Sequence, residues 1–522
     1  MKDTSAQSER RSGATTGGSE RFLLALDEIR KEASARLDPQ RRAQMGQFMT
    51  PSPIATFMAE MFQCGKSAVR VLDPGAGVGS LCAALVTTLC QRPTPPTTIA
   101  VTAYEIDPDL VCYLRETLDR CLRACADAGI SFQARLVDRD FLEASANGLA
   151  GDLFGKGERG RFDCVILNPP YRKIRTESQE RSLLRSIGLE TTNLYTGFVA
   201  VAARLLAQGG EMVAITPRSF CNGPYFEPFR RYFLRDMRFR RVHVFDARDK
   251  AFGEDKVLQE NVIFHAVRTS EADPAVIVSA NAALGADLRS RTIKHGELIH
   301  PSDRHAVIHV VPEKDGKSRR DQISSLGGTL TTLGLTVSTG RVVDFRAKDL
   351  LRAQPGKNTV PLIYPCHFKD GFVRWPNGST RKPNALALGP RAEALVVSEG
   401  HYVLTKRFSS KEERRRVVAA VYDPVRVTAQ DVAFENHLNY FHERGSGLPA
   451  TLAKGLAAYL NSSLVDIYFR QFSGHTQVNA SDLRSLPYPT CSALIALGRR
   501  IDVSFPGQEE LDRLVEEVLF DG

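Results

Sequence analysis

The 522-residue sequence contains no run of about eighteen apolar residues, the length that a helix needs to cross a bilayer. We therefore expect no membrane span. The first twenty residues are rich in Ser, Thr, Gly and Arg and lack the apolar core of a signal peptide. This composition predicts a disordered tail over residues 1–20.

The sequence also lacks the spacing of zinc ligands. Its ten cysteines include no Cys-x-x-Cys pair, and its eleven histidines include no His-Glu-x-x-His arrangement. We expect no metal site. Scattered cysteines without pairing suit the reducing cytoplasm. No internal repeat and no constellation of nuclease residues is evident.

Acidic residues are fewer than basic ones, 60 against 69, which gives a net charge of +9 and a pI near 9.0. This excess favours a polyanionic partner, although a mildly basic enzyme without one is the alternative. Two clusters could contact phosphates, or could be solvated helix faces paired with Glu412 and Glu413. The clusters are Arg230, Arg231, Arg235, Arg238, Arg240 and Arg241, and then Lys406, Arg407, Lys411, Arg414, Arg415 and Arg416.

Strand-like and helix-like patterns alternate over residues 21–270, which predicts an α/β domain with a doubly wound, mainly parallel sheet. The expected strands are 69–73, 99–104, 131–137, 162–167 and 211–215. Beyond residue 270 the rhythm changes. We expect a connecting region over 271–319, a mixed α/β domain over 320–490 and a helical segment over 491–522, with helical patterning at 411–421 and 452–460.

Asn168, Pro169, Pro170 and Tyr171 follow the expected strand 162–167 directly. Ligands of open α/β sheets bind at the carboxyl ends of the strands. There, the Asn168 amide oxygen and the Pro169 carbonyl can accept both hydrogens of an exocyclic amine, and Tyr171 can stack on a planar ring. The alternative is an ordinary proline turn after a strand.

A glycine-rich turn, Asp73 to Gly79, follows the first strand and opens a helix. Gly75 and Gly77 allow a ligand to approach the backbone closely. Such a turn also occurs in dinucleotide sites. Asp73, however, suits a ligand that carries an ammonium group and would repel a pyrophosphate, so it favours S-adenosylmethionine as the cofactor.

The next two strand ends agree with that cofactor. Glu105 can accept both ribose hydroxyls, Asp140 can accept from an adenine amine, and Phe141 can pack on the adenine ring. Upstream, Gly46-Gln47-Phe48-Met49-Thr50-Pro51 precedes a helix. Thr50 is interpreted either as the N-cap of that helix or as part of a turn that closes over the methionine end of the cofactor.

Gly-Gln-Phe-x-Thr-Pro, Asp-Pro-Gly-Ala-Gly-x-Gly and Asn-Pro-Pro-Tyr, followed by a large C-terminal domain, occur here in one order. In this order the sequence resembles the gamma-type N6-adenine DNA methyltransferases of the TaqI type. The resemblance implies a class I fold dependent on S-adenosylmethionine, and methylation of an adenine flipped out of double-stranded DNA. It also implies a bacterial or archaeal cytoplasmic protein of a restriction-modification system, with any cognate restriction endonuclease a separate protein.

By this resemblance, Asn168 and Pro169 hold the target amine and Tyr171 stacks on the flipped base. The cofactor site is formed by Thr50, Asp73, Gly75, Gly77, Glu105, Asp140 and Phe141. The family's second stacking aromatic matches Phe252, with Phe245 as a rival and core packing as the alternative. The C-terminal domain recognises the DNA target, and residues 473–479 with Leu486-Pro487 resemble its closing stretch.

Two other functions stay open at this point. Methyltransferases that act on amino or amide groups of RNA or protein also use Asn-Pro-Pro-Tyr, but they usually lack the early Gly-Gln-Phe-x-Thr-Pro turn and so large a second domain. A non-catalytic DNA-binding subunit is the other alternative, and the intact site residues argue against it.

Overall fold

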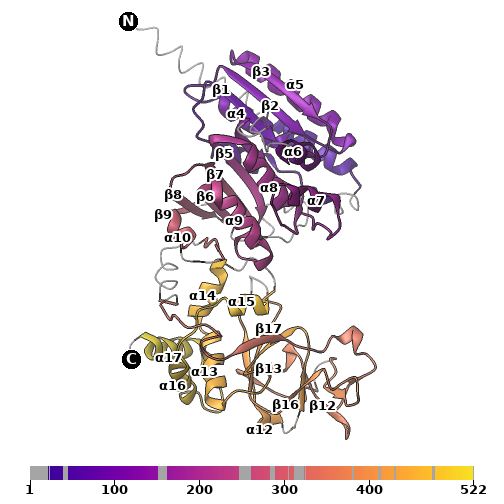
Figure 1. Cartoon of the computed structure of the whole chain (residues 1–522), viewed down its shortest axis with the longest axis vertical. Helices are drawn as coiled ribbons and strands as arrows, with labels where there is room; N and C mark the ends of the chain where they lie inside the picture. The colour runs from indigo at the N-terminus through magenta and orange to yellow at the C-terminus, as the bar shows by residue number, and fades with distance from the viewer. Residues whose placement is uncertain are drawn as a thin grey trace. The chain divides into compact units, whose positions relative to one another are not determined.

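A computed structural model describes residues 22, 24–38, 45–150, 161–245, 260–281, 288–301, 303, 305–310, 322–323, 325–378, 381–409, 413–427, 429, 431–472 and 477–520. The chain divides into two compact units, residues 1–313 and 314–522. Figure 1 shows the elements of each unit. No helix of the described residues is long and apolar enough to cross a membrane.

The first unit is built on a nine-stranded sheet of order β3-β2-β1-β4-β5-β7-β6-β8-β9. The five strands from β3 to β5 are parallel, so the expected doubly wound, mainly parallel fold is confirmed. The order reverses between β1 and β4, where a ligand crevice forms in such sheets. These strands are β1 (Ala68–Asp73), β2 (Thr98–Tyr104), β3 (Ser131–Val137), β4 (Phe162–Leu167) and β5 (Leu206–Pro217).

The sheet continues past residue 270, where the sequence alone places the end of the first domain. β7 lies antiparallel between β5 and β6, and β8 and β9 extend the edge. The alternating apolar residues of β8 and the register with β6 place these strands in the same sheet, and not in a connecting region. The strands are β6 (Met237–Phe245), β7 (Asn261–Arg268), β8 (Ala275–Asn281) and β9 (Arg289–Lys294).

Helices cover both faces of the sheet and form two apolar cores. One core contains α3, α4 and α5, and the other contains α6, α8 and α9. The bounds are α3 (Ser52–Ala59), α4 (Ser80–Cys90), α5 (Pro108–Asp127), α6 (Phe141–Ala150), α7 (Gln179–Ser186), α8 (Leu194–Leu205), α9 (Glu227–Asp236) and α10 (His295–Leu298), with 3-10 turns η2 (Arg218–Cys221) and η3 (Pro224–Phe226).

The second unit contains a six-stranded sheet of order β10-β20-β17-β18-β14-β13 and a five-stranded sheet of order β11-β15-β12-β19-β16. The strands are β10 (Thr336–Thr339), β11 (Leu351–Arg352), β12 (Thr359–Ile363), β13 (Phe368–Lys369), β14 (Phe372–Val373), β15 (Ala385–Ala387), β16 (Val396–Ser398), β17 (Tyr402–Lys406), β18 (Ala419–Tyr422), β19 (Asp431–Phe434) and β20 (Leu438–His442).

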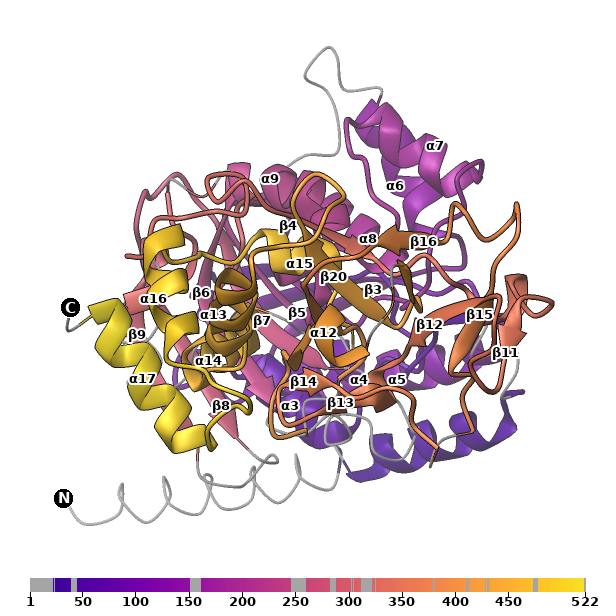
Figure 2. The ribbon, with the colours of Figure 1, turned by 90° about the horizontal axis from the view of Figure 1, so that it is seen from below.

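Helices α13 to α17 follow the last strand of this unit in the chain, and Figure 2 shows α13, α16 and α17 together. α13 and α16 cross at two glycines: a Cβ on Gly455 would lie 1.8 Å from the Leu494 carbonyl oxygen, so the backbones touch. Residues 491–520 therefore pack within this unit. The helices are α12 (Pro424–Val427), α13 (Ala450–Leu460), α14 (Ser463–Phe472), α15 (Ala480–Arg484), α16 (Cys491–Arg499) and α17 (Gln508–Phe520), with 3-10 turns η5 (Asp344–Arg346) and η6 (Pro365–His367).

The helical patterning expected over residues 411–421 is wrong. Residues 419–422 form the buried strand β18, which pairs with β17 and β14. The apolar run 417–421 can fit a helix or a strand by pattern alone. Pairing with two neighbouring strands, which the local pattern does not contain, selects the strand.

Candidate active site

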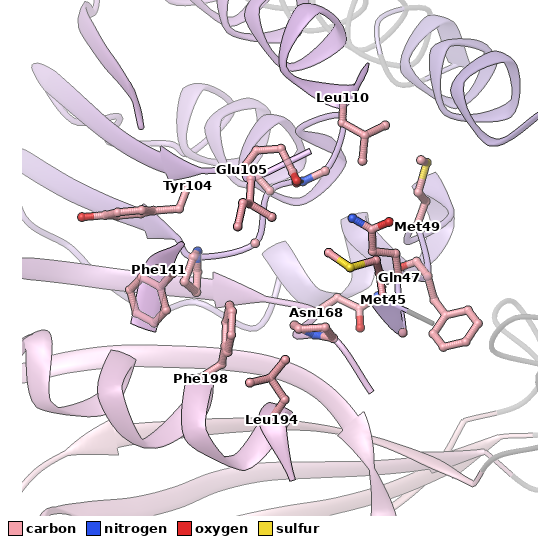
Figure 3. A pocket seen from close by; sticks show the side chains of 18 of the residues that line it. Met45, Gln47, Met49, Tyr104, Glu105, Leu110, Phe141, Asn168, Leu194 and Phe198 are labelled. Atoms are coloured by element: carbon pink, nitrogen blue, oxygen red, sulfur yellow. Dashed lines mark hydrogen bonds between the residues drawn. The ribbon is translucent and has the colours of Figure 1, made fainter. Parts of the chain in front are cut away.

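A cavity of about 270 Å³ opens at the carboxyl ends of β1, β2 and β4 in the first unit (Figure 3). Eight residues expected at a site line it: Thr50, Gly75, Gly77, Glu105, Asp140, Phe141, Asn168 and Pro170. Asp73, Pro169 and Tyr171 lie next to lining residues in the chain. The structure thus brings together residues that are up to 120 positions apart in the sequence.

Glu105 directly follows β2 and is held by backbone amides of two loops. Its carboxylate accepts hydrogen bonds from Gly77 N at 2.7 Å and from Asp107 N at 2.8 Å. Gly77 has a φ of +57°, a conformation that glycine adopts without strain. Burial raises the pKa of Glu105, while these amide donors act in the opposite direction. The glycine-rich loop therefore fixes a carboxylate at the cavity wall.

Asp73, at the end of β1, is fully buried behind this loop and does not line the cavity. Among the described residues, neither of its carboxylate oxygens has a well-aligned hydrogen-bond partner, although the amides of Gly75 and Cys82 lie close enough to lower its pKa. Burial outweighs them and raises the pKa to about 7. A buried carboxylate without a well-aligned partner is costly, and a cation in the neighbouring cavity would favour its charged form.

The raised pKa of Asp73 predicts a pH-dependent stability difference between the wild type and Asp73→Asn. The folded protein keeps the Asp73 proton up to about pH 7, whereas the unfolded chain releases it near pH 4. The stability that this bound proton contributes is therefore full below about pH 4 and is lost as the pH rises to about 7. We expect Asp73→Asn to gain several degrees in Tm relative to the wild type between pH 5 and pH 8, in thermal unfolding without cofactor. A Tm difference that stays constant with pH would contradict the assignment.

Asp140 and Phe141 begin α6 at the end of β3. One Asp140 oxygen accepts from Glu143 N at 2.8 Å and so caps the helix. The Phe141 ring lies 5.2 Å from the rings of both Tyr104 and Phe198. Figure 3 shows Phe141 and Phe198 next to each other on one side of the cavity, near Tyr104. Sequence reasoning missed Phe198, because its helical spacing on α8 is also that of a core residue.

The Asn168 side chain is oriented by the Gly46–Thr50 turn. Its amide nitrogen donates to the Phe48 carbonyl at 2.7 Å and to the Thr50 hydroxyl at 3.0 Å. A carbonyl only accepts, so the group facing Phe48 must be the NH₂ of the amide. The Asn168 oxygen is consequently turned away from the turn. Thr50 does not cap α3, whose N-cap is Pro51, so the N-cap interpretation of Thr50 is wrong.

Tyr171 is anchored at both ends. Its backbone N–H donates to the Gly46 carbonyl at 3.0 Å, and its hydroxyl donates to the Ile215 carbonyl at 3.3 Å. The ring lies 5.6 Å from Phe48 and 6.3 Å from Tyr195. Gly46 has a φ of +66°, and a Cβ there would meet the Tyr171 backbone at 2.9 Å, so only glycine fits this contact without strain. Burial raises the pKa of the Tyr171 hydroxyl.

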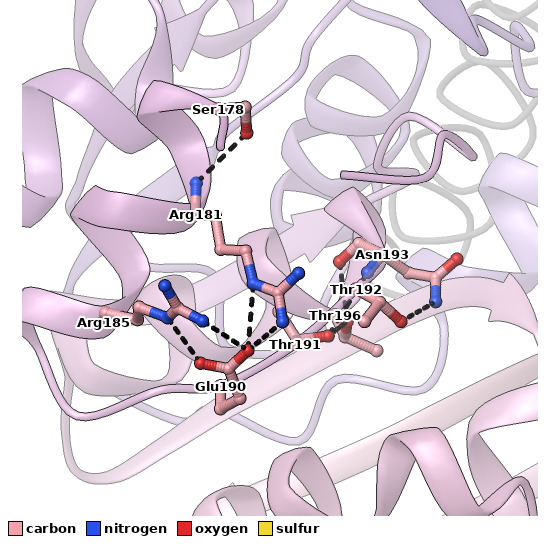
Figure 4. A network of polar contacts seen from close by, with 8 residues as sticks. All are labelled: Ser178, Arg181, Arg185, Glu190, Thr191, Thr192, Asn193 and Thr196. Carbon is pink, nitrogen blue, oxygen red and sulfur yellow. Dashed lines mark hydrogen bonds and ion pairs between the residues drawn. The ribbon is translucent and has the colours of Figure 1, made fainter. Parts of the chain in front are cut away.

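Residues 172–194 form an excursion between β4 and α8 that is closed at its base by backbone bonds, including Leu194 N to the Arg172 carbonyl at 2.8 Å. Figure 4 shows Arg181 and Arg185 converging on Glu190; Arg185 Nε lies 2.7 Å from Glu190 Oε2. The excursion brings Arg172 and Glu180, which are paired at 3.0 Å, to the wall of the cavity. Both residues lay outside the expected site.

The chain has well-matched relatives among known proteins. A sequence profile of the family described as Eco57I restriction-modification methylase matches residues 117–252. The chain is 39% identical over 498 residues to the Type II methyltransferase M.PstI of Providencia stuartii, covering 95% of this chain and 97% of that protein. It is 41% identical over 504 residues to the Type II methyltransferase M.BsuBI of Bacillus subtilis, covering 95% of this chain and 98% of that one.

The chain belongs to the Type II methyltransferases. It is therefore a DNA-modifying enzyme of the restriction-modification type. The solved structure of the Type IIL restriction-modification enzyme MmeI in complex with DNA matches with a TM-score of 0.52 at 12% identity, over 94% of this chain and 73% of that one. At this identity the match shows a shared fold alone.

In this methyltransferase the arginines of residues 230–241 are held by contacts within the protein, and phosphate contact by this cluster stays a prediction for its exposed members alone. Arg230 is 1% exposed and donates to the carbonyls of Phe220, Gly223 and His305. The others pair with carboxylates, carbonyls or aromatic rings of the protein: Arg231, Arg235, Arg238, Arg240 and Arg241. Sequence alone does not reveal such partners.

The second aromatic of the methyltransferase site stays unassigned. Phe252 lies outside the described residues. Its rival Phe245 is 5% exposed and packs edge-on against His243 at 4.9 Å, within the core beside α3. Phe245 thus has the contacts of a core residue. Within the described residues, no three His, Cys, Asp or Glu side chains converge to hold a metal ion.

Proposed function

We propose that this methyltransferase transfers the methyl group of S-adenosylmethionine to the N6 amine of an adenine flipped out of double-stranded DNA. The orientation of Asn168 is the observation that carries the proposal. Its NH₂ group is committed to Phe48 and Thr50, so its oxygen is the acceptor offered to an incoming amine. Asparagine accepts without placing a full negative charge beside the cofactor.

The residues of the cavity fit S-adenosylmethionine. Buried Asp73, without a well-aligned partner, lies behind the loop where its charge favours an ammonium group. Glu105 retains lone pairs for ribose hydroxyls beyond its two amide donors, and Phe141 with Phe198 offers an apolar wall for adenine. When bound, the cofactor supplies a methyl group that its sulfonium already activates, so the protein mainly supplies orientation.

An adenine amine is a poor nucleophile, because its lone pair is delocalised into the ring. Hydrogen bonds from the amine to Asn168 Oδ1 and to the Pro169 carbonyl favour a tetrahedral nitrogen whose lone pair is directed at the methyl group. The protein needs no strong base before transfer, since the methylated amine loses its proton afterwards.

Duplex DNA hides the target amine within the base stack, and flipping the base costs a few kcal/mol. In this proposal the Tyr171 ring offsets part of that cost by stacking on the flipped base, which contributes about 1–3 kcal/mol. The bond from its hydroxyl to Ile215 and the contact with Gly46 hold the ring in place before the base arrives. Preorganisation of this kind reduces the entropy cost of binding.

The sequence motifs alone also allow a methyltransferase of amino or amide groups in RNA or protein, and membership of the Type II methyltransferases argues against it. Transfer of tritium from labelled S-adenosylmethionine to duplex DNA, total RNA and a protein extract would decide between them. We expect incorporation into duplex DNA alone. Incorporation into RNA or protein, with none into DNA, would contradict the proposal. We also propose that the protein is cytoplasmic and that it acts beside a separate cognate endonuclease.

We further propose that residues 320–490 of the second unit choose the DNA sequence. This unit is compact by itself, so its exchange is feasible. Replacing residues 314–522 with the matching unit of a related methyltransferase is expected to change the methylated sequence to that of the donor. The sites can be mapped by methylation-aware sequencing of DNA from expressing cells. An active chimera that keeps the original sequence would place recognition in the first unit.

A further inference from the structure

Three chain segments meet at one end of the six-stranded sheet in the second unit. β17 ends at Lys406, which pairs with Leu438 at the start of β20. Beyond that pair, Arg407 N donates to the His437 carbonyl at 2.8 Å, and Gly340 N donates to the Leu438 carbonyl at 2.8 Å. The ends of β10, β17 and β20 therefore present one composite surface.

His437 is held in a fixed orientation by a buried carboxylate. Glu435 is fully buried, and it accepts from His437 Nδ1 at 2.5 Å and from His437 N at 2.8 Å. The His437 side chain nevertheless stays 48% exposed. Nε2 lies on the opposite edge of the ring from Nδ1, so it is the nitrogen available to a ligand. A carboxylate that fixes an imidazole in this way is typical of functional histidines.

Phe408 lies beside this imidazole and is 44% exposed. The two rings are 4.9 Å apart and tilted by 43°. The backbone under Phe408 is fixed by a bridge to Gln477, and Val478 N donates to the Arg407 carbonyl at 2.7 Å. An exposed aromatic ring on a fixed backbone can bury a large apolar area against a partner without much loss of conformational freedom. It is an available contact for a partner.

The charge around this pair is positive. Lys406 and Arg407 directly precede Phe408 in the chain, Arg407 Nη1 donates to the Asn436 carbonyl next to His437 at 3.1 Å, and the Glu435 carboxylate beneath His437 is buried and bound. A polyanion is therefore the complementary partner. A phenyl ring gains little from phosphate, whereas base edges, thymine methyl groups and sugars offer it apolar contact. Among polyanions, the pair consequently favours the grooves of DNA.

We propose that Phe408 and His437 are specificity-determining residues that contact base pairs of the target site. The proposal rests on the proposed function, and it adds which side chains of the second unit read DNA. Nε2 of His437 would hydrogen-bond a base edge, the Phe408 ring would pack on an adjacent base or sugar, and the basic flank would face the phosphates.

The full-length protein with S-adenosylmethionine and a pool of duplexes with randomised sequence provides the test. The methylated motif of the wild type is determined first, followed by methylation rates at that motif and at every site that differs by one base pair. Phe408→Ala and His437→Ala are compared with Val503→Ala, a control that shortens a side chain 77% exposed between α16 and α17 of the same unit. If Phe408→Ala or His437→Ala has a lowered Tm, then Phe408→Leu or His437→Gln is measured in its place.

We expect each alanine variant to lose about tenfold in rate at the intact motif, with discrimination relaxed at one or two positions. Every variant should bind S-adenosylmethionine as the wild type does. The Val503→Ala variant should methylate the same motif as the wild type. Unchanged discrimination at every position would overturn the inference, and so would an equal loss at all sites, which marks a phosphate or structural role. A wild type that methylates no duplex would instead contradict the proposed function.

Discussion

Asn168→Ala is expected to lower methyl transfer to DNA by about 10²–10³-fold, the usual loss when one preorganised hydrogen-bonding group of a reaction site is removed. The variant loses the acceptor for the target amine. It also loses the two bonds to Phe48 and Thr50. S-adenosylmethionine should still bind, because Glu105 and the glycine-rich loop are unchanged. Single-turnover transfer from labelled cofactor and calorimetric cofactor binding measure the two effects separately.

Gln133→Ala is a matched control, since it removes an exposed amide from β3 of the same unit. Asn168→Asp adds a second comparison: a carboxylate cannot donate to the Phe48 carbonyl, so it would be repelled by the turn that orients asparagine. Near-normal transfer by Asn168→Ala, with the control also normal, would remove Asn168 from the reaction. A parallel loss of cofactor affinity would assign it to the cofactor site instead.

Tyr171→Ala should reduce both base flipping and methyl transfer by roughly five- to 150-fold, which corresponds to the about 1–3 kcal/mol of one stacking contact. Tyr171→Phe should be milder, because it keeps the ring and loses only the 3.3 Å bond to the Ile215 carbonyl. Fluorescence of 2-aminopurine at the target position rises when the base leaves the stack, and it measures flipping directly.

Wild-type fluorescence and rate in Tyr171→Ala would reduce Tyr171 to a structural residue of the turn. A severe loss in Tyr171→Phe would show a different requirement. In that case the anchoring of the hydroxyl on Ile215, and not the stacking area alone, would determine whether the ring is productive.

Much of the fold of the first unit could be predicted from the sequence, because short local patterns show where its strands and helices lie. β1 ends at Asp73, while Glu105 and Asn168 directly follow β2 and β4, and the strand order of a doubly wound sheet brings these ends to one edge. Residues 131–137 are β3 as expected. Glu105, Asp140 and Asn168 line one cavity for the same reason.

The structural features that the sequence did not predict depend on contacts between residues that are distant in the chain. The hydrogen bonds from Asn168 to Phe48 and Thr50 span about 120 residues, so no local pattern shows that this turn orients the amide. Arg230 belongs to a basic cluster of the kind that binds phosphates, yet its side chain is buried and donates to backbone carbonyls. Residues 419–422 form a strand only because β17 and β14 pair with them.

The most direct test of the central claim is the chemical identity of the methylated base. Purified protein is incubated with duplex DNA and S-adenosylmethionine whose methyl group carries three deuterium atoms, and the DNA is digested to nucleosides for mass spectrometry. The account predicts labelled N6-methyladenine from the wild type, and its near absence from Asn168→Ala. Labelled N4-methylcytosine or C5-methylcytosine, or equal yields of N6-methyladenine from both proteins, would contradict it.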